Sequence, residues 1–254
     1  MGDDTFGPGA METISYNYQL STCEVTNEQF AAFIAAGGYT VRSYWTANGW
    51  SWRGTKTEPV YWNDSWWNGL LQPVAVGWYE AVAFCNWLSA REGLTKAYDD
   101  AGRASLTATG YRLPTEVEWE YAAAKGGSGQ PERLYAWGDI WDSAKAVCSV
   151  SPASATKPAD VGSTSLEGDT PQGLCDMTGN MAEWCSDNQQ ADVDVAAGTD
   201  RYYFIDDLPT TPFPRLGGTY YSNTTNLLRV PNRQFMEGSY GAGAGLTSFR
   251  VSRR

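Results

Sequence analysis

Residues 216–250 have the composition of a contact surface and lack the side chains that most often perform catalysis. The stretch is rich in Tyr, Asn, Thr, Gln and Gly, and it holds no Cys, no His and a single carboxylate, Glu237. Tyrosine supplies large, stiff contact area, whereas Ser, Gly and Asn supply adaptable hydrogen bonding. These residue types predict ligand contact in this stretch.

The rest of the chain is also poor in catalytic candidates. It has no His, which removes the commonest general base and the usual Ser–His and Cys–His pairs. Glu116 and Glu120 share one face of a predicted helix, and we favour a solvated face over an acid–base pair. Cys85 is expected to be a buried free thiol. No CxxC pair occurs, which argues against a zinc ribbon and leaves the disulfides unassigned among Cys23, Cys85, Cys148, Cys175 and Cys185.

The overall composition limits the possible partners. A net charge of -11 argues against non-specific nucleic-acid binding, which depends on Lys and Arg. A hydrophobic content of 42% is enough for a core. No apolar run approaches the roughly 18 residues that a membrane helix needs. Residues 1–4 are polar and show no secretory signal, which leaves the compartment open.

Local patterns predict one domain, 1–254, of α+β class. Capping boxes that begin at Thr26 and Thr115 open two helices. Apolar residues at helical spacing predict another helix over 76–92, and residues 13–20 alternate enough to form a strand. The C-terminal part looks rich in strands and loops.

A loop over residues 39–69 is unusually rich in tryptophan. It could form a stacking platform for sugars or bases. We favour the alternative that a long irregular loop needs large aromatic anchors to hold it to the core. The residues concerned are Trp45, Trp50, Trp52, Trp62, Trp66 and Trp67.

Several motifs in a fixed order carry a resemblance that covers nearly the whole chain. They begin at Glu24 (EVTNEQF), Pro73 (PVAVGWYEA), Gly110 (GYRLPTEVEWEYAA), Tyr135 (YAWGD), Gly179 (GNMAEW), Gly217 (GGTY) and Phe249 (FR). In this order they resemble formylglycine-generating-enzyme-type (sulfatase-modifying factor) domains. The resemblance implies a C-type lectin-like fold with a twisted antiparallel sheet, two main helices, much irregular structure and chain ends that lie close together.

The resemblance allows two family chemistries to be checked against the sequence. Formylglycine-generating oxidases hold copper with a Cys pair in the segment that corresponds to residues 217–250, where this chain has no Cys. Related sulfoxide synthases hold iron with His, which is absent here. We therefore expect the protein not to be an enzyme. Two alternatives stay open: a copper oxidase that uses another Cys pair, and a glycan-binding module that uses the Trp-rich loop.

The resemblance also implies a structural calcium site. Relatives bind calcium around the Gly-Asn-x-x-Glu-Trp motif with side-chain and backbone oxygens, which are the ligands that Ca²⁺ prefers. Carried over to this chain, the ligands are Asp176, Gly179, Met181 and Glu183. The alternative is that Glu183 only anchors a turn.

One branch of this fold family uses the C-terminal segment as a variable binding surface. Its members are the variable proteins of diversity-generating retroelements, in which adenine-directed mutagenesis rewrites selected codons. The chain looks most like those of Treponema, although Thr219, Tyr220 and Ser248 depart from the pattern. We expect residues 216–250 to display a diversified ligand-binding surface. Its candidate contacts are Tyr220, Tyr221, Asn223, Asn226, Asn232, Gln234, Phe235, Met236 and Tyr240.

Three arginines in the segment are expected to brace the scaffold: Arg229, Arg233 and Arg250. The resemblance further implies an unknown protein or glycan ligand. It places the chain at the cell surface or outside the cell, with a lipid anchor as one option and a targeting segment that is absent from this sequence.

Overall fold

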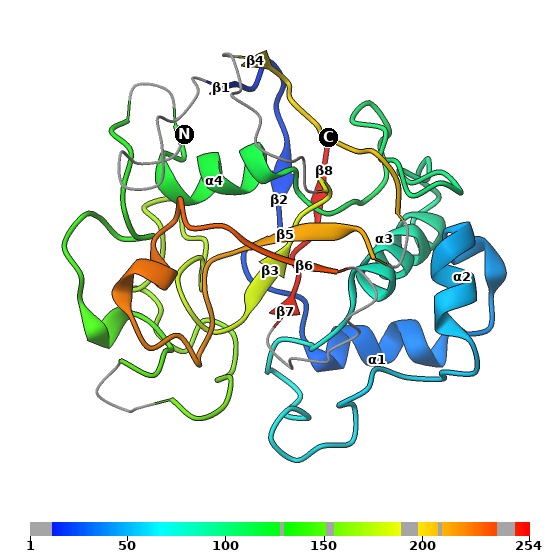
Figure 1. The fold of residues 1–254 in the computed structure, drawn as a ribbon, viewed down its shortest axis with the longest axis horizontal. Helices are drawn as coiled ribbons and strands as arrows, with labels where there is room; N and C mark the ends of the chain where they lie inside the picture. The colour runs from blue at the N-terminus through cyan, green and yellow to red at the C-terminus, as the bar shows by residue number, and fades with distance from the viewer. Residues whose placement is uncertain (1–11, 128–129, 151–154, 189–197, 208–209, 238–246) are drawn as a thin grey trace.

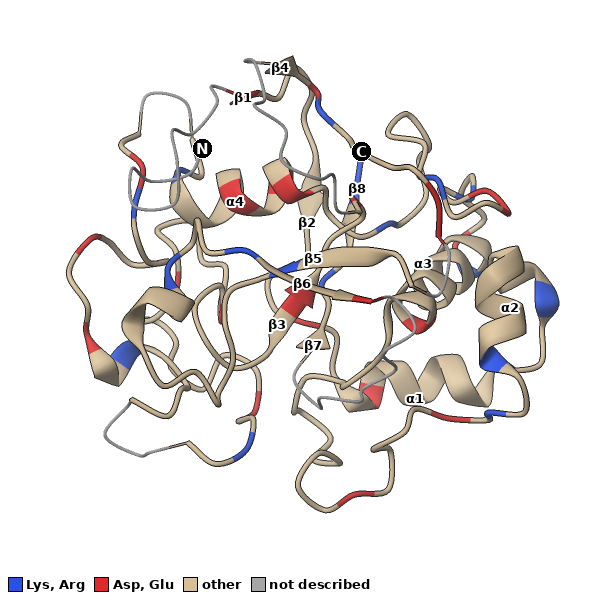
Figure 2. Cartoon of the chain, in the orientation of Figure 1, with Lys and Arg blue, Asp and Glu red and all other residues tan. Residues whose placement is uncertain are grey.

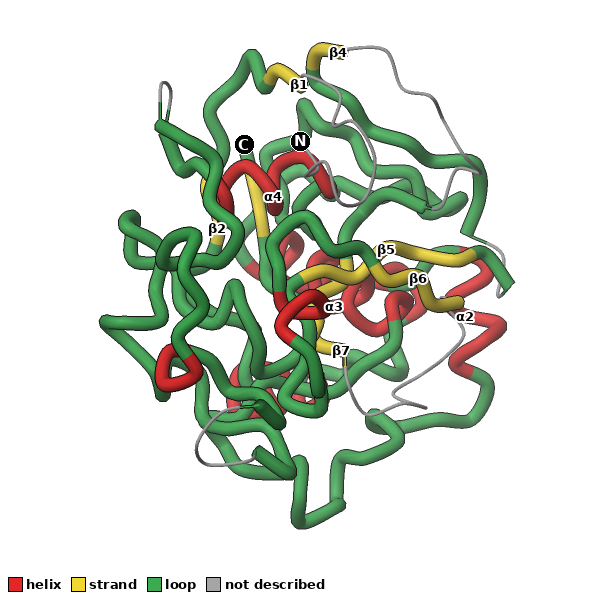
Figure 3. The backbone as a smooth tube through the Cα atoms, turned by 60° about the vertical axis from the view of Figure 1, so that its left-hand side comes forward, coloured by secondary structure: helices red, strands yellow, loops and turns green. Residues whose placement is uncertain are grey.

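The computed structural model describes residues 12–127, 130–150, 155–188, 198–207, 210–237 and 247–254. Loops, drawn green in Figure 3, make up most of the chain and connect short helices and strands. The helices are α1 (Asn27–Ala35), α2 (Ala47–Arg53), α3 (Trp78–Arg91) and α4 (Glu116–Ala124), with 3-10 turns η1 (Arg42–Tyr44), η2 (Ser143–Lys145) and η3 (Thr225–Leu228). The strands are β1 (Glu12–Thr13), β2 (Gln19–Leu20), β3 (Ala182–Trp184), β4 (Gly198–Thr199), β5 (Pro212–Leu216), β6 (Gln234–Glu237), β7 (Thr247–Ser248) and β8 (Ser252–Arg253).

A four-stranded sheet with the order β6-β5-β3-β7 lies at the centre of the fold. In Figure 1 it lies between α4 on one side and α1, α2 and α3 on the other. Strand β5 pairs antiparallel with β6 and with β3, whereas β3 and β7 run parallel. The sheet is therefore mixed rather than wholly antiparallel as expected. The long connection between β3 and β7 makes this possible, because it lets the chain return to the end where β3 began.

The two ends of the described chain lie side by side, as expected. Strand β2 pairs antiparallel with β8, in the register Gln19 with Arg253. The expected strand over residues 13–20 is broken in its middle. There the hydroxyls of Tyr16 and Tyr18 donate to the side chain and the backbone carbonyl of Glu118, each at 2.8 Å. These contacts hold the segment against α4 instead of in a sheet.

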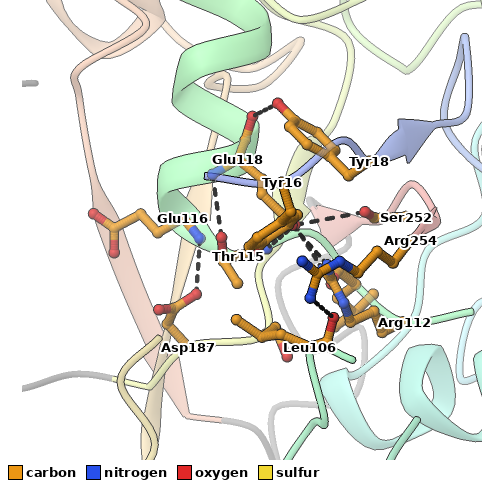
Figure 4. A network of polar contacts seen from close by, with 12 residues as sticks. Tyr16, Tyr18, Leu106, Arg112, Thr115, Glu116, Glu118, Asp187, Ser252 and Arg254 are labelled. Atoms are coloured by element: carbon orange, nitrogen blue, oxygen red, sulfur yellow. Dashed lines mark hydrogen bonds and ion pairs between the residues drawn. The ribbon is translucent and has the colours of Figure 1, made fainter. Parts of the chain in front are cut away.

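The capping box that opens α4 is part of a larger polar network (Figure 4). The Thr115 hydroxyl accepts from the Glu118 N–H, and the Glu118 carboxylate accepts from the Thr115 N–H. The same carboxylate binds the Arg112 guanidinium through two contacts of 2.6 Å, and both side chains are buried. A local helix start is thereby tied to Arg112, whose backbone pairs in turn with Ser252 near the chain end.

The predicted helix over 76–92 is α3, and it forms the centre of the main core. Its N-terminal box uses Glu80, whose carboxylate accepts from the Gly77 N–H at 2.8 Å. The Trp78 ring stacks on Phe213 of β5, with 4.0 Å between ring centroids. Cys85 is a buried free thiol, as predicted.

The Trp-rich loop contains a helix that the sequence pattern did not reveal. Thr46 caps α2 by accepting from the Gly49 N–H at 2.9 Å. Trp45 is buried and donates its indole N–H to the Gly38 carbonyl at 2.7 Å, so it anchors the loop as expected. Trp66, in contrast, leaves 52% of its surface exposed. Different tryptophans of this loop therefore have different roles.

Candidate functional site

The C-terminal segment begins with a turn at the end of β5 that requires glycine. Gly217 and Gly218 have φ angles of 89° and 73°, in the left-handed region that disfavours side chains. A Cβ at Gly218 would lie 2.6 Å from the carbonyl oxygen of Leu227. The close approach directs the chain away from the sheet and across the 3-10 turn η3.

Residues 219–222 form a tight turn in which two adjacent tyrosines point in opposite directions. The Ser222 hydroxyl accepts from the Thr219 N–H at 2.9 Å, and the Ser222 N–H donates to the Thr219 carbonyl at 2.9 Å. Tyr220 turns inward and is 5% exposed, and its burial raises its phenol pKa to about 12. Tyr221 turns outward and is 69% exposed. Only the second of these tyrosines presents its ring to solvent.

The inward tyrosine joins the C-terminal segment to the Trp-rich loop. The rings of Tyr220 and Trp67 meet edge to face, with centroids 5.5 Å apart. Trp67 in turn stacks on Tyr61, with 5.5 Å between ring centroids, and the centroids of the Tyr220 and Tyr221 rings are 6.5 Å apart. We call these four residues together with the exposed Trp66 the aromatic surface. The end of the Trp-rich loop and the C-terminal segment are thus in direct contact.

Asn180 of the Gly-Asn-x-x-Glu-Trp motif holds this surface in place. It is fully buried with a left-handed φ of 55°, and its carbonyl accepts from the Tyr220 N–H at 2.6 Å. Its N–H donates to Val147, and its side-chain oxygen accepts from the Ala159 N–H at 3.0 Å. Met181 packs beneath Tyr61 and Trp67. No pattern in the sequence indicates this supporting role.

The other predicted ligand contacts divide by exposure. Asn223, Asn226 and Phe235 are exposed, with Phe235 at 42%, whereas Gln234 and Met236 are half-buried. Asn232 is buried, its backbone N–H donates to the Arg229 carbonyl at 2.9 Å, and its side-chain oxygen has no hydrogen-bond partner among the described residues. Tyr240 lies outside the described residues.

Arg233 fixes the C-terminal segment to α4. Its guanidinium forms ion pairs with Glu116 and with Glu120, the latter at 2.6 Å. Acidic residues of α4 are red in Figure 2. Glu116 and Glu120 were expected to form a solvated face of this helix, and this was wrong. They are largely covered because Arg233 packs against them. Asp187 lies beside Glu116 and accepts from its N–H at 2.7 Å (Figure 4). Burial, followed by the Glu116 charge, raises the Asp187 pKa to about 7.

Arg250 and Glu183 of β3 form a buried ion pair. Two guanidinium nitrogens of Arg250 contact the two Glu183 carboxylate oxygens, each at 2.6 Å. The three remaining N–H groups of Arg250 donate to carbonyls of Ser21, Thr22 and Cys175 at 2.9 to 3.1 Å. Trp119 also donates to Glu183, at 2.8 Å. The brace predicted for Arg250 is therefore present, and Glu183 is already neutralised by a side chain.

Among the other expected calcium ligands, Asp176 lies near this pair. The Asp176 carboxylate accepts from the Gly162 N–H at 2.5 Å and faces the buried Glu24. Neither Glu24 oxygen accepts from a described donor, and burial and the Asp176 charge raise the Glu24 pKa well above its ordinary range. Because Arg250 occupies Glu183, that carboxylate does not fit a calcium ligand as it stands. The calcium site stays a prediction.

The five cysteines bear on the copper-oxidase alternative, which requires a pair of them. Cys23 is joined to Cys175 by a disulfide, beside the Glu24 and Asp176 pair. Cys85, Cys148 and Cys185 are buried. In the described part of the chain, no group of three or more Cys, Asp or Glu side chains is placed to hold a metal ion. None of the helices in that part is long and apolar enough to cross a membrane.

Known proteins of similar sequence include enzymes. Hercynine oxygenase from Mycolicibacterium thermoresistibile is 30% identical over 181 residues, which cover 66% of this chain and 35% of that protein. Formylglycine-generating enzyme from Thermomonospora curvata is 28% identical over 226 residues, which cover 73% of this chain and 65% of that protein. The chain thus spans only about a third of the first relative's length. The expectation that the chain is not an enzyme was wrong, because these relatives are enzymes.

The fold has close counterparts among solved structures. Treponema denticola variable protein 1 superposes with a TM-score of 0.68 at 21% identity, covering 93% of this chain and 84% of that one. PvdO from Pseudomonas aeruginosa superposes with a TM-score of 0.66 at 22% identity, covering 95% and 82%. Residues 1–253 also match the family described as the sulfatase-modifying factor enzyme 1-like domain. The chain therefore belongs to the family of sulfatase-modifying factor enzyme 1-like domains and has the α+β, C-type lectin-like fold of that family.

Proposed function

We propose that the protein binds a ligand through the aromatic surface. The observation that carries this proposal is the contact between Trp67 and Tyr220, whose neighbours in the sequence, Trp66 and Tyr221, are exposed. Exposed aromatic rings on a rigid base lose little conformational freedom on binding, so they make strong contact residues. Asn223 and Asn226 add exposed amides to the same segment.

The firm attachment of this segment agrees with a surface whose residues vary. Arg233 and Asn180 hold the backbone through charge and buried hydrogen bonds, and neither contact depends on the exposed side chains. We propose that the exposed positions are diversified, as the likeness to variable proteins suggests. A second copy of the coding segment, differing only at adenines, would be expected nearby in the genome. Its absence would refute diversification and leave ligand binding untouched.

A two-stage binding experiment tests the proposal. The intact chain is screened on a glycan array and against a displayed library of linear peptides, and each ligand retained is titrated against variants. Tyr221→Ala and Trp66→Ala are each expected to weaken binding roughly tenfold or more, as loss of an aromatic anchor does. Leu166→Ala is the control, since Leu166 is exposed and belongs to neither segment. Equal affinity of all three variants would refute the proposal.

We also propose that the chain works at the cell surface or outside the cell. The disulfide between Cys23 and Cys175 supports this, because such bonds persist mainly in oxidising compartments. Mass spectrometry of the native protein in the presence of an alkylating agent tests it. Alkylation of Cys23 and Cys175 in freshly prepared protein would count against an oxidising location.

Oxygen-dependent catalysis is a second candidate function. The relationship to a hercynine oxygenase, at 30% identity, favours it. Oxygen uptake by the purified chain, supplied with hercynine and ferrous or cuprous ion, provides the test. Uptake above that of the metal alone would support it, and uptake equal to that of the metal alone would count against it.

A further inference from the structure

Strand β6 forms one edge of the central sheet, and its outer side has the features of a binding site for another strand. Among the described strands, only β5 pairs with β6, in the register Phe213 with Met236 and Pro214 with Phe235. Figure 1 shows β6 beside β5 at the front of the sheet. The direction of each backbone group on β6 follows from this register.

Two prolines in β5 determine which groups of β6 point outward. Pro212 and Pro214 have no N–H, and the Pro214 carbonyl accepts from the Cys185 N–H at 3.1 Å. That carbonyl therefore points toward β3 and away from β6. Hydrogen-bonded and non-hydrogen-bonded pairs alternate in an antiparallel ladder. Phe235, opposite Pro214, thus occupies a non-hydrogen-bonded pair, and so does Glu237 opposite Pro212.

The outward groups consequently belong to Phe235 and Glu237. Their N–H and C=O groups face away from β5, and no backbone group in the described part of the chain pairs with them. They lie two residues apart, which is the spacing at which a strand bonds to a neighbour. Met236 lies between them: its side chain packs against the main core, and its backbone N–H and C=O groups face β5.

The side chains of this edge do not discourage pairing. Natural sheets usually protect an edge with Lys, Pro or inward charges. Here the prolines lie on the inner strand, and Phe235 is 42% exposed. Phe235 and Glu237 project from the same face because side chains alternate along a strand. A neighbouring strand would therefore meet an apolar ring and, two residues away, a carboxylate.

We propose that β6 binds an extended polypeptide segment, which adds to the sheet as a further strand. The ligand would bond to the backbone of Phe235 and Glu237 and would carry an apolar residue beside Phe235 and a Lys or Arg beside Glu237. Backbone pairing supplies affinity in such complexes, and alternate side chains supply specificity. The inference goes beyond the proposed function, because β6 is a site separate from the aromatic surface and its ligand is a polypeptide.

Amide hydrogen exchange measured by NMR on the intact chain tests this proposal. The probe is a six-residue peptide that alternates Lys and Val, and its control is the same peptide N-methylated at every peptide bond. The unmodified peptide is expected to slow exchange at Phe235 and Glu237 by roughly fivefold or more, as a new hydrogen bond to each N–H requires. The Met236 amide, already bonded to β5, should not change. Equal effects of the two peptides, or none from either, would overturn the proposal.

A matched pair of proline variants gives a second readout. Phe235→Pro removes an outward N–H that no other strand uses. The chain should therefore still fold, but the peptide should no longer slow exchange of the Glu237 amide. Met236→Pro removes an N–H that bonds to β5 and should destabilise the protein. Phe235→Ala keeps the outward N–H and is expected to retain peptide protection at Glu237. Retained protection in Phe235→Pro would contradict backbone pairing.

The Tyr221→Ala variant separates this proposal from the proposed function. It should leave peptide protection at β6 unchanged, because Tyr221 lies in the turn before η3 and not in the strand. If the peptide does not pair with β6 while another ligand still binds in a way that depends on Tyr221, only the edge site is refuted. Strand pairing in the absence of any Tyr221-dependent ligand would refute only the aromatic surface.

Discussion

Trp67 and Tyr220 meet edge to face with 5.5 Å between their ring centroids, and this contact joins two distant parts of the chain. Each residue is supported from another direction, Trp67 by Tyr61 and Met181 and Tyr220 by the Asn180 carbonyl. The arrangement gives the aromatic surface a buried base and an exposed rim. Its consequences can be tested one contact at a time.

The two adjacent tyrosines should differ sharply in their contribution to stability. Tyr220→Ala removes a buried ring and is expected to lower the free energy of unfolding by about 3 kcal/mol. Tyr221→Ala removes an exposed ring and should change it by less than about 0.5 kcal/mol. Urea unfolding followed by fluorescence measures both values. Similar losses in the two variants would contradict the assigned inward and outward orientations.

The Arg250–Glu183 pair should be essential to the folded state. Arg250→Ala leaves Glu183 buried without its partner, so we expect a loss of about 3–5 kcal/mol in unfolding free energy. The control is Arg253→Ala, because the polar contacts of Arg253 lie at the surface: an ion pair of 3.9 Å with Glu92 and a hydrogen bond of 2.8 Å to the Gln19 side chain. Such a surface pair is worth at most about 1 kcal/mol. Equal destabilisation by the two substitutions would count against a special role for the buried pair.

Gly218 should tolerate no side chain. Its left-handed φ costs a non-glycine residue about 1–2 kcal/mol, and the contact with the Leu227 carbonyl adds roughly 1–3 kcal/mol in Gly218→Ala. Gly93→Ala is a matched control, since Gly93 has a similar φ of 68° with open space around its Cβ position. It should show the conformational cost alone. Thermal unfolding of the pair measures the difference, and equal losses would exclude the steric contribution.

Asp187 should make stability depend on pH. Its folded-state pKa of about 7 lies above the ordinary 3.8. At a pH between these two values the folded protein therefore holds a proton that the unfolded chain has released. Stability from this group is complete below the ordinary pKa and is lost as the pH rises to about 7. Asp187→Asn should flatten this part of the profile, measured by unfolding at several pH values. An unchanged slope would show that Asp187 is not the group responsible.

The starts of two helices were predicted from local sequence patterns. The candidate site, in contrast, depends on contacts between residues that are far apart in the chain. The capping boxes at Thr26 and Thr115 occur as expected, because each depends on residues three apart. The contact between Trp67 and Tyr220 could not be foreseen, since nothing in either segment specifies its partner. Cys23 and Cys175 are likewise separated by 152 residues, and their pairing follows only from the fold.

The same limit explains the error about α4. Glu116 and Glu120 lie on one helix face, and helical spacing alone cannot show whether solvent or a cation covers that face. Arg233 covers it through ion pairs with both carboxylates. The family resemblance identified the fold, whereas the absence of Cys from residues 217–250 did not exclude catalysis.

Ligand affinity of the Trp66→Ala and Tyr221→Ala variants tests the central claim most directly. One ligand retained from the glycan array or the peptide library is titrated by calorimetry against both variants, their double variant and Leu166→Ala. A shared surface predicts that each single substitution weakens binding roughly tenfold or more, with Leu166→Ala unchanged. Loss on changing Trp66 with full affinity in Tyr221→Ala would place binding on the loop alone and contradict a surface formed by both segments.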